Sequence, residues 1–348
     1  MTNSVQHPQP AISIPLWPHV YGGPASTGKI KSIPDDFMVQ EILSFQPEGS
    51  GEHAFLQIQK QGENTEYVAR LLARFAGVRQ RDIGYAGLKD RHGRTTQWFS
   101  VWLPGKEDPG WSQLETPSIQ VLQAVRHARK LKRGVLSGNR FQLLIRDWAG
   151  DKSRLEMQLQ CIKKSGFPNY FGSQRFGHQG QNVNKALALL QGAKVKRELR
   201  SIYLSAVRSY LFNQILSQRI IANNWNQAIA GDVFIFNHSN SYFKPEQIDD
   251  CVRQRIGQGE IHPTAIMYGK GVLETQAEAL AIEEKVISQH QCLSDGLIDY
   301  GLEASRRALR VMPDDLSWEF IADDGLLLRF CLPAGCYATS LLREIVDC

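Results

Sequence analysis

The hydrophobic pattern of this chain changes twice along its length, and this limits the folds that it can adopt. Strand-like alternation dominates the first part, as in "EHAFLQIQK", where Ala54, Leu56 and Ile58 fall on one face. Helical spacing dominates the middle, most clearly in "SIYLSAVRSYLFNQILSQRI", and strand-like "LLLRFCLP" returns near the end. Strands and helices do not alternate as in a doubly wound fold. The pattern therefore predicts an α+β protein with an antiparallel or mixed sheet and a second domain inserted in its chain.

A net charge of +5 over 348 residues is modest, but it is unevenly distributed. The segment "RHARKLKRGVLSGNRFQLLIR", from 126 to 146, carries seven Lys or Arg residues and no acid. Such a run is typical of a solvated face or of contacts with a polyanion. If the partner is RNA, the candidate contacts in this run are Arg129, Lys130, Lys132 and Arg133.

Several other classes of function leave no convincing signal in the sequence. "GPASTGKI", from 23 to 30, is close to a phosphate-binding loop, but Ile30 stands where a hydroxyl should hold Mg²⁺, so we expect no nucleotide cofactor. The six cysteines include no C-x-x-C pair and no His–Cys cluster has zinc-ligand spacing, so we expect no metal. The sequence shows neither a secretory signal nor an apolar stretch of the roughly 20 residues that a membrane span needs. We therefore expect a cytoplasmic protein with no membrane partner.

The stretch "AGLKDRHGR", from 86 to 94, places a single carboxylate, Asp90, among basic residues. Cations within about 4–6 Å would keep Asp90 ionised and lower its pKa, which suits a nucleophile or an electrostatic stabiliser better than a proton donor. The alternative is a glycine-bounded turn in which Asp90 makes only a local hydrogen bond. On the local sequence alone, the turn is the favoured interpretation.

The stretch "SGNRFQLLIR" places Asn139 and Phe141 two residues apart on a predicted strand, so both side chains face the same way. An amide beside an aromatic ring can hydrogen-bond the edge of a base and stack on its face, which is how flipped-out bases are held. The alternative is that Asn139 is a turn residue and Phe141 belongs to the core.

Two further stretches contain aromatic residues in loops. "GFPNYFGSQRFGHQGQN", from 166 to 182, has four aromatic residues among Gly, Asn, Gln and Arg175, which suits RNA or a packed domain junction equally. In "LPAGCYATSLLRE", Tyr337 follows a Pro-Ala-Gly turn and could line a pocket or belong to the core.

In their order along the chain, six segments together resemble the TruD family of tRNA pseudouridine synthases. They are "KSIPDDFMVQEI", "AGLKDRHGRTTQ", "KLKRGVLSGNRFQLLIR", "GFPNYFGSQRFG", "LSAVRSYLFNQIL" and "LPAGCYATSLLREI". The resemblance runs from about residue 28 to about residue 344. It implies an α+β pseudouridine synthase catalytic core at 1–164 and 311–348. It also implies an inserted, helix-rich α/β TruD-specific domain at 165–310.

The resemblance also implies the site and the reaction. Asp90 matches the catalytic aspartate of the family. The matches to substrate-binding positions are Phe37, Asn139, Phe141, Tyr337 and Lys89, although the role of Lys89 does not transfer and the family has Phe where this chain has Tyr337. The implied reaction is the isomerisation of uridine to pseudouridine in tRNA, at position thirteen of the D arm in bacterial members, without cofactor or metal. We expect a monomer.

Two rival hypotheses remain open on the residues alone. A carboxylate-dependent nucleoside or sugar hydrolase would need a second acid paired with Asp90 and would release free uracil. A tRNA-binding protein without catalysis would use Asp90 only as a turn residue.

Overall fold

The structure is a computed structural model that describes residues 11–321 and 324–348. Residues 1–10 lie outside the described part. The chain divides into two compact units. The sheet unit comprises residues 24–164, 312–338 and 345–348. The helical unit comprises residues 165–311 together with 11–23 and 339–344.

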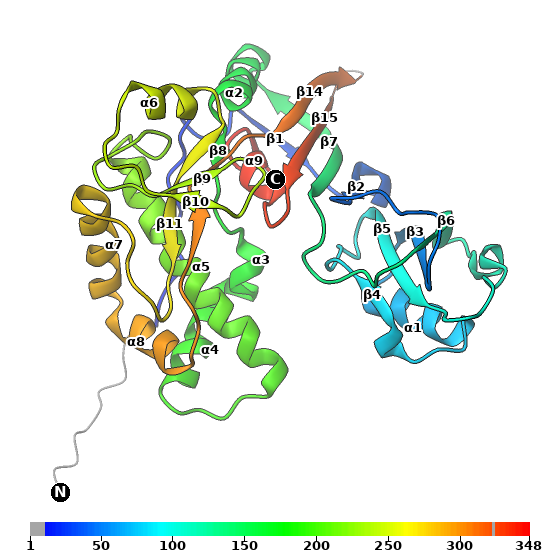
Figure 1. Cartoon of the computed structure of the whole chain (residues 1–348). Helices are drawn as coiled ribbons and strands as arrows, with labels where there is room; N and C mark the ends of the chain where they lie inside the picture. The colour runs from blue at the N-terminus through cyan, green and yellow to red at the C-terminus, as the bar shows by residue number, and fades with distance from the viewer. Residues whose placement is uncertain (1–10, 322–323) are drawn as a thin grey trace, which may run out of the picture. The chain divides into compact units, whose positions relative to one another are not determined.

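The sheet unit is built on one large mixed sheet in the order β14-β15-β7-β2-β5-β3-β6 (Figure 1). β2 runs antiparallel to β7 and parallel to β5, so the mixed sheet predicted from the sequence is confirmed. β1 adds to β7 and β16, and β4 adds to β5. The strands are β1 (Ser26–Lys29), β2 (Phe37–Ile42), β3 (His53–Gln61), β4 (Ile83–Tyr85), β5 (Arg94–Trp102), β6 (Ile119–His127), β7 (Gly138–Gly150), β14 (Asp314–Ile321), β15 (Gly325–Pro333) and β16 (Val346–Asp347).

Helix α1 (Thr65–Phe75) covers part of one face of this sheet (Figure 1). Asn64 precedes it in an extended conformation, as expected for a residue that starts a helix. Val68 and Leu72 project from one side of α1 into a core cluster with Leu56 of β3 and Phe99 of β5. The face of the sheet on which Leu56 and Phe99 lie is therefore closed by α1. The remaining helical segments of the sheet unit are α2 (Lys152–Ser165), which ends at the unit boundary, and the short 3₁₀ turns η1 (Pro34–Asp36), η2 (Gln80–Asp82) and η3 (Trp111–Leu114).

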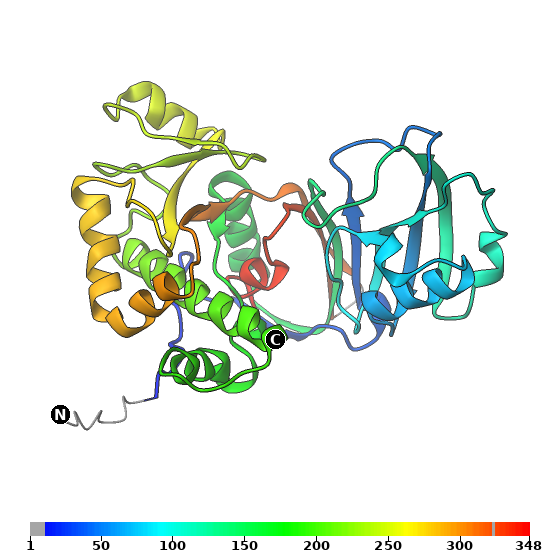
Figure 2. The same ribbon diagram turned by 60° about the horizontal axis from the view of Figure 1, so that its bottom comes forward.

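The helical unit is organised around α5 (Arg197–Ile221), a helix of 25 residues that packs with α4, α7 and β11 (Figure 2). Its apolar residues are buried on more than one side, as expected for a helix at the centre of a domain. The other helices are α3 (Ser173–Phe176), α4 (Gln181–Leu190), α6 (Asp250–Gly257), α7 (Ala277–Gln289), α8 (Gln291–Asp299) and the 3₁₀ turn η4 (His178–Gly180), while α9 (Ala338–Leu342) begins at the unit boundary. A four-stranded sheet, β10-β9-β11-β12, and a pair, β8 with β13, complete the unit. These strands are β8 (Phe167–Pro168), β9 (Phe234–Phe236), β10 (Tyr242–Phe243), β11 (Ile261–Met267), β12 (Ser305–Ala308) and β13 (Arg310–Val311).

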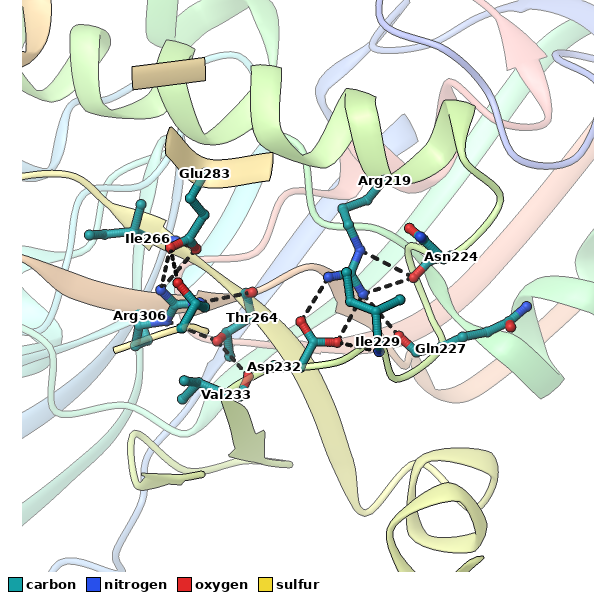
Figure 3. A network of polar contacts seen from close by, with 11 residues as sticks. Arg219, Asn224, Gln227, Ile229, Asp232, Val233, Thr264, Ile266, Glu283 and Arg306 are labelled. Atoms are coloured by element: carbon teal, nitrogen blue, oxygen red, sulfur yellow. Dashed lines mark hydrogen bonds and ion pairs between the residues drawn. The ribbon is translucent and has the colours of Figure 1, made fainter. Parts of the chain in front are cut away.

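Two buried ion pairs tie α5 and α7 to the loops and strands beside them (Figure 3). Arg219 of α5 donates to Asp232 at 2.7 Å and also to the main-chain carbonyls of Asn224 and Gln227. Glu283 of α7 pairs with Arg306 at 2.9 Å. Each carboxylate also accepts a main-chain N–H, so both charges are compensated by more than one partner.

Candidate active site

Asp90 lies in the loop that connects β4 to β5, residues 86–93, and this loop is fixed on both sides. The side-chain amide of Gln97 donates to the carbonyl of Gly87 at 2.7 Å, and the main-chain N–H of Lys89 donates to Oγ1 of Thr65 at 3.1 Å. Thr65 is the first residue of α1 and Gln97 belongs to β5, so the loop is attached to the start of the helix and to the sheet. The side chain of Asp90 is 25% exposed.

The charge next to Asp90 comes from a residue distant in sequence. Lys31, in the segment between β1 and η1, donates from Nζ to the Asp90 carboxylate, and the main-chain N–H of His92 donates to the other oxygen at 2.9 Å. Burial alone would raise the pKa of Asp90, but the hydrogen bond from Lys31, the hydrogen bond from His92 and the charge of Lys31 hold it below the ordinary value. Lys31 itself has a left-handed backbone (φ 58°), an uncommon conformation for a residue other than glycine.

Of the basic residues adjacent to Asp90 in sequence, His92 helps to lower its pKa, whereas Lys89, Arg91 and Arg94 contact other groups. Lys89 pairs with Glu41 at 2.6 Å, and its side chain is only 9% exposed. Arg91 donates to the carbonyl of Gly62, and Arg94 pairs with Asp35. The basic surroundings seen in the sequence are therefore real, but Lys89 and Arg94 are paired with other carboxylates.

Glu41 and Lys89 form a buried pair below the loop. Besides Lys89, the Glu41 carboxylate accepts the main-chain N–H of Trp98 at 2.9 Å, and it is fully buried. Lys89 was predicted to bind substrate, but its ammonium lies in this pair. Lys89 directly precedes Asp90, so its pair with Glu41 also restrains the main chain at Asp90.

Lys60 is a second lysine that the sequence analysis did not select. It is almost completely buried on β3, and its Nζ donates to the main-chain carbonyls of Glu63 at 2.8 Å and Asp90 at 3.2 Å. Burial, the largest influence, lowers the pKa of Lys60 to about 8, and the negative charge of Asp90 opposes this shift. An ammonium therefore lies directly behind the main chain of Asp90.

Two aromatic rings, Phe37 and Phe141, continue from Asp90 along the sheet. Gly93, at the end of the Asp90 loop, lies so close to Phe37 that an added Cβ would come within 2.5 Å of its carbonyl oxygen. Nζ of Lys31 lies 4.1 Å from the centre of the Phe37 ring. The Phe37 ring meets Phe141 edge-on at 6.4 Å, and Phe141 stacks on Phe330 at 5.3 Å. Asp90, Lys31 and the two rings thus form one continuous set of contacts.

Asn139 lies on the same face of β7 as Phe141, as expected from their spacing. The register pairs Asn139 with Glu41 on β2 and with Leu332 on β15, while Phe141 pairs with Val39 and Phe330. The side-chain oxygen of Asn139 is buried and accepts no hydrogen bond. A buried acceptor without a donor is unfavourable in the free protein and is ready to receive a donor from a ligand.

Comparison with known proteins identifies the family. The family model for tRNA pseudouridine synthase D (TruD) matches residues 18–193 and 179–345. The chain is 48% identical to tRNA pseudouridine synthase D of Methylococcus capsulatus over 95% of this chain and 94% of the relative. It is 43% identical to the enzyme of the same name from Hydrogenovibrio crunogenus over 97% of both chains. The chain belongs to the tRNA pseudouridine synthase D family.

The fold comparison agrees with this assignment. The crystal structure of a protein from Methanosarcina mazei described as tRNA pseudouridine synthase D superposes with a TM-score of 0.70 and covers 96% of this chain and 95% of that chain. At 20% identity this likeness shows a shared fold. The predicted family and fold class and the enzyme class of pseudouridine synthase are therefore confirmed.

The remaining predicted residues of this TruD chain are held in different ways. Tyr337 is half-buried, four residues after the end of β15. In the basic run, Arg129 and Lys132 are exposed, Lys130 donates to the carbonyl of Arg81, and Arg133 donates to the hydroxyl of Tyr85 at 3.2 Å. Arg175 belongs to the helical unit, where it donates to Ser205 at 2.9 Å and lies over the ring of Phe171.

Neither a metal cluster nor a membrane-spanning helix is found in the part of the chain that the structure describes. Over residues 11–321 and 324–348, no group of three or more His, Cys, Asp and Glu side chains is placed to hold a metal ion. Within the same ranges, no helix is long and apolar enough to cross a membrane.

Replacing Lys31 by Met should raise the pKa of Asp90, because burial then acts without the opposing lysine. A carboxylate with a lowered pKa is ionised at lower pH than usual, so the variant should lose the ionised form at a higher pH than the wild type. The displaced carboxylate should also slow catalysis, by about 10²-fold. Carbon NMR titration of Asp90 and pH profiles of single-turnover rates measure both effects. Lys29→Met, which breaks only the exposed pair with Asp147, is the control, and an unchanged Asp90 titration in Lys31→Met would contradict this account.

The lowered pKa of Lys60 predicts a pH-dependent stability. The folded chain releases the Lys60 proton near pH 8, whereas the unfolded chain keeps it up to about 10.5, so the free energy of unfolding should rise with pH in that window. The effect is on the order of 3 kcal/mol, since each pKa unit corresponds to about 1.36 kcal/mol. Lys60→Met lacks this proton. Urea unfolding at pH 7 and pH 10 should show that the wild type gains stability relative to Lys60→Met as the pH rises. If the difference in free energy of unfolding between the two proteins stayed constant, Lys60 would not titrate in this window.

Proposed function

We propose that this chain isomerises uridine to pseudouridine within tRNA, with Asp90 as the catalytic carboxylate and position thirteen of the D arm as the target. One observation carries the proposal. An aspartate held ionised by Lys31 lies beside two contacting and largely buried aromatic rings, and an unsatisfied amide oxygen lies on the same strand face as the second ring. The sheet unit is then the catalytic domain, and the helical unit is the inserted family-specific domain.

Asp90 acts at the ribose in this proposal, either as a nucleophile at C1′ or as a base at the 2′-proton. The N1–C1′ bond breaks and its electrons leave with the uracil. The uracil turns in place and C5 bonds to C1′, which releases the Asp90 carboxylate from C1′ or returns the 2′-proton, according to the route. The proton on C5 is then released and N1 takes up a proton. Atoms and charge balance without any oxidant, metal or phosphate donor, so the proposal includes no cofactor.

The surrounding residues hold the uracil while it is detached. Phe37, Phe141 and Tyr337 offer ring faces on which a base can stack. The buried oxygen of Asn139 can accept the N3–H of uracil, which would satisfy an acceptor that has no partner in the free protein. Lys89 is assigned a positioning role through Glu41 rather than a substrate contact.

The hydrolase alternative is less well supported by the site. A hydrolase with two carboxylates needs a second acid available to activate water. Glu41, the buried carboxylate below the Asp90 loop, is already engaged by Lys89 and by the N–H of Trp98. Asp90 therefore acts as a single carboxylate in our proposal.

The test is to incubate the purified protein with unmodified tRNA, in EDTA and without added cofactor, and then to map pseudouridine chemically. We expect one modified position in the D arm and an intact chain. An abasic position with free uracil would show a hydrolase, and unmodified tRNA recovered in a complex would show a binding protein. Sedimentation of the same preparation tests the expected monomer, and fractionation of cells tests the expected cytoplasmic location.

A further inference from the structure

A hollow on the sheet unit lies between β4 and the loop that carries the basic run. Its volume is about 360 Å³, and its floor is formed by Ile83, Gly84 and Leu131. Gln80 and Tyr85 stand on its rim with Lys130, Lys132 and Arg133. This volume lies near the lower end of the range of about 300–1,000 Å³ for ligand pockets, so the hollow suits one small unit of a polymer and not a helix.

The walls of this hollow are fixed in place. The N–H of Leu131 donates to Oγ of Ser100 at 3.0 Å, and the N–H of Gly134 donates to the carbonyl of Ala86 at 2.8 Å. A Cβ on Gly84 would come within 2.3 Å of the Leu131 carbonyl oxygen, so only glycine allows the loop to lie this close to β4. The basic run is therefore not a freely solvated segment at this point.

The chemistry of the lining is selective. Among the described residues that line the hollow, three are cationic and none is an aspartate or a glutamate. The guanidinium of Arg133 lies over the Tyr85 ring, 5.5 Å from its centre, and donates to its hydroxyl, so the two form one aromatic and cationic surface. Gln80 supplies an exposed amide that can donate and accept hydrogen bonds. Aromatic rings and guanidinium groups stack on bases, amides contact base edges, and lysines contact phosphates.

We propose that this hollow binds one nucleotide of the substrate tRNA, separate from the uridine that reacts. The base stacks on the Tyr85–Arg133 surface beside Gln80, and Lys132 contacts the phosphate. The site positions the RNA and takes no part in the bond changes at Asp90. This inference rests on the proposed function for the identity of the RNA.

A substitution that fills the hollow without changing its charge shows whether tRNA binding depends on the shape of the pocket or only on its positive charge. Gln80→Trp places a large side chain at the exposed rim, and Gln120→Trp makes the same change on the exposed face of β6 as a control. Binding of an unmodified tRNA transcript is measured by fluorescence anisotropy, and thermal midpoints check the fold. We expect Gln80→Trp to raise the Kd for tRNA by about tenfold or more, since base stacking is worth about 1–3 kcal/mol. Gln120→Trp should stay within about twofold of the wild type.

A second pair of variants tests the phosphate contact. Lys132→Ala should weaken tRNA binding and reduce the slope of log Kd against log salt by about one unit. Lys106→Ala removes an exposed charge outside the hollow and should leave that slope unchanged. Normal affinity in Gln80→Trp would overturn the proposal, as would a wild type that does not bind tRNA.

The outcomes also separate this inference from the proposed function. If the wild type binds tRNA with these effects but forms no pseudouridine, the pocket stands and the proposed function fails. If pseudouridine forms and Gln80→Trp binds normally, only the pocket fails.

Discussion

Replacing Asp90 by Asn should abolish pseudouridine formation and leave tRNA binding intact. Asn keeps the shape of the side chain and can still accept the N–H of His92, but it carries no charge for Lys31 and cannot act as a nucleophile or base at neutral pH. We expect the single-turnover rate at saturating tRNA to fall by at least about 10⁴-fold, as for other catalytic residues that act at the reacting atoms. Anisotropy with the same tRNA should give a Kd close to that of the wild type.

Asp82→Asn is the matched control for this experiment. Asp82 is the nearest other carboxylate before Asp90 in sequence, and it makes a local ion pair with Arg79. The variant should form pseudouridine at the wild-type rate. If Asp90→Asn stayed within about tenfold of the wild type, the catalytic assignment would be wrong, because one lost charge at a reacting centre has a larger effect.

Replacing Arg219 by Met should cause the largest loss of stability among the changes considered. The substitution leaves the fully buried Asp232 without its cation and leaves the carbonyls of Asn224 and Gln227 without their donor. Breaking a buried pair by removing one partner costs about 3–5 kcal/mol. Urea unfolding followed by circular dichroism should show this loss as an earlier transition.

Two comparisons show whether the stability lost in Arg219→Met arises because the Arg219–Asp232 pair is buried. Arg255→Met breaks a partly exposed pair with Glu260 and should cost no more than about 1 kcal/mol. The double variant Arg219→Met with Asp232→Leu removes both charges and should recover part of the stability. Equal losses in the free energy of unfolding of Arg219→Met and Arg255→Met would contradict the claim that an unpaired, buried Asp232 causes the larger loss.

The fold could be predicted from the sequence where burial follows a clear period. The alternation of Ala54, Leu56 and Ile58 predicted a strand, and all three residues are buried on β3 in one core cluster. Strand β6 gave no signal because only its two terminal residues, Ile119 and His127, are fully buried. Half-exposed strands do not show the alternation on which such predictions depend.

The site could be predicted only where its residues are neighbours in the chain. The spacing of Asn139 and Phe141 placed them on one face, and the register of β7 agrees. The spacing could not show that Lys31, 59 residues away, holds Asp90, or that Lys60 donates to its main-chain carbonyl. Both contacts depend on which strands pair in the sheet, and no local pattern encodes that. The left-handed backbone at Lys31 became visible only in the folded chain.

The most direct test of the central claim is release of tritium from tRNA that carries the label at C5 of uridine. Isomerisation replaces the C5–H bond by a C5–C1′ bond, so each pseudouridine formed sends one tritium to water. We predict that tritium appears in water in step with pseudouridine, while the tRNA stays intact and no free uracil is found. Tritium that stays in the tRNA, or that leaves it as labelled uracil, would contradict the claim that this chain isomerises uridine.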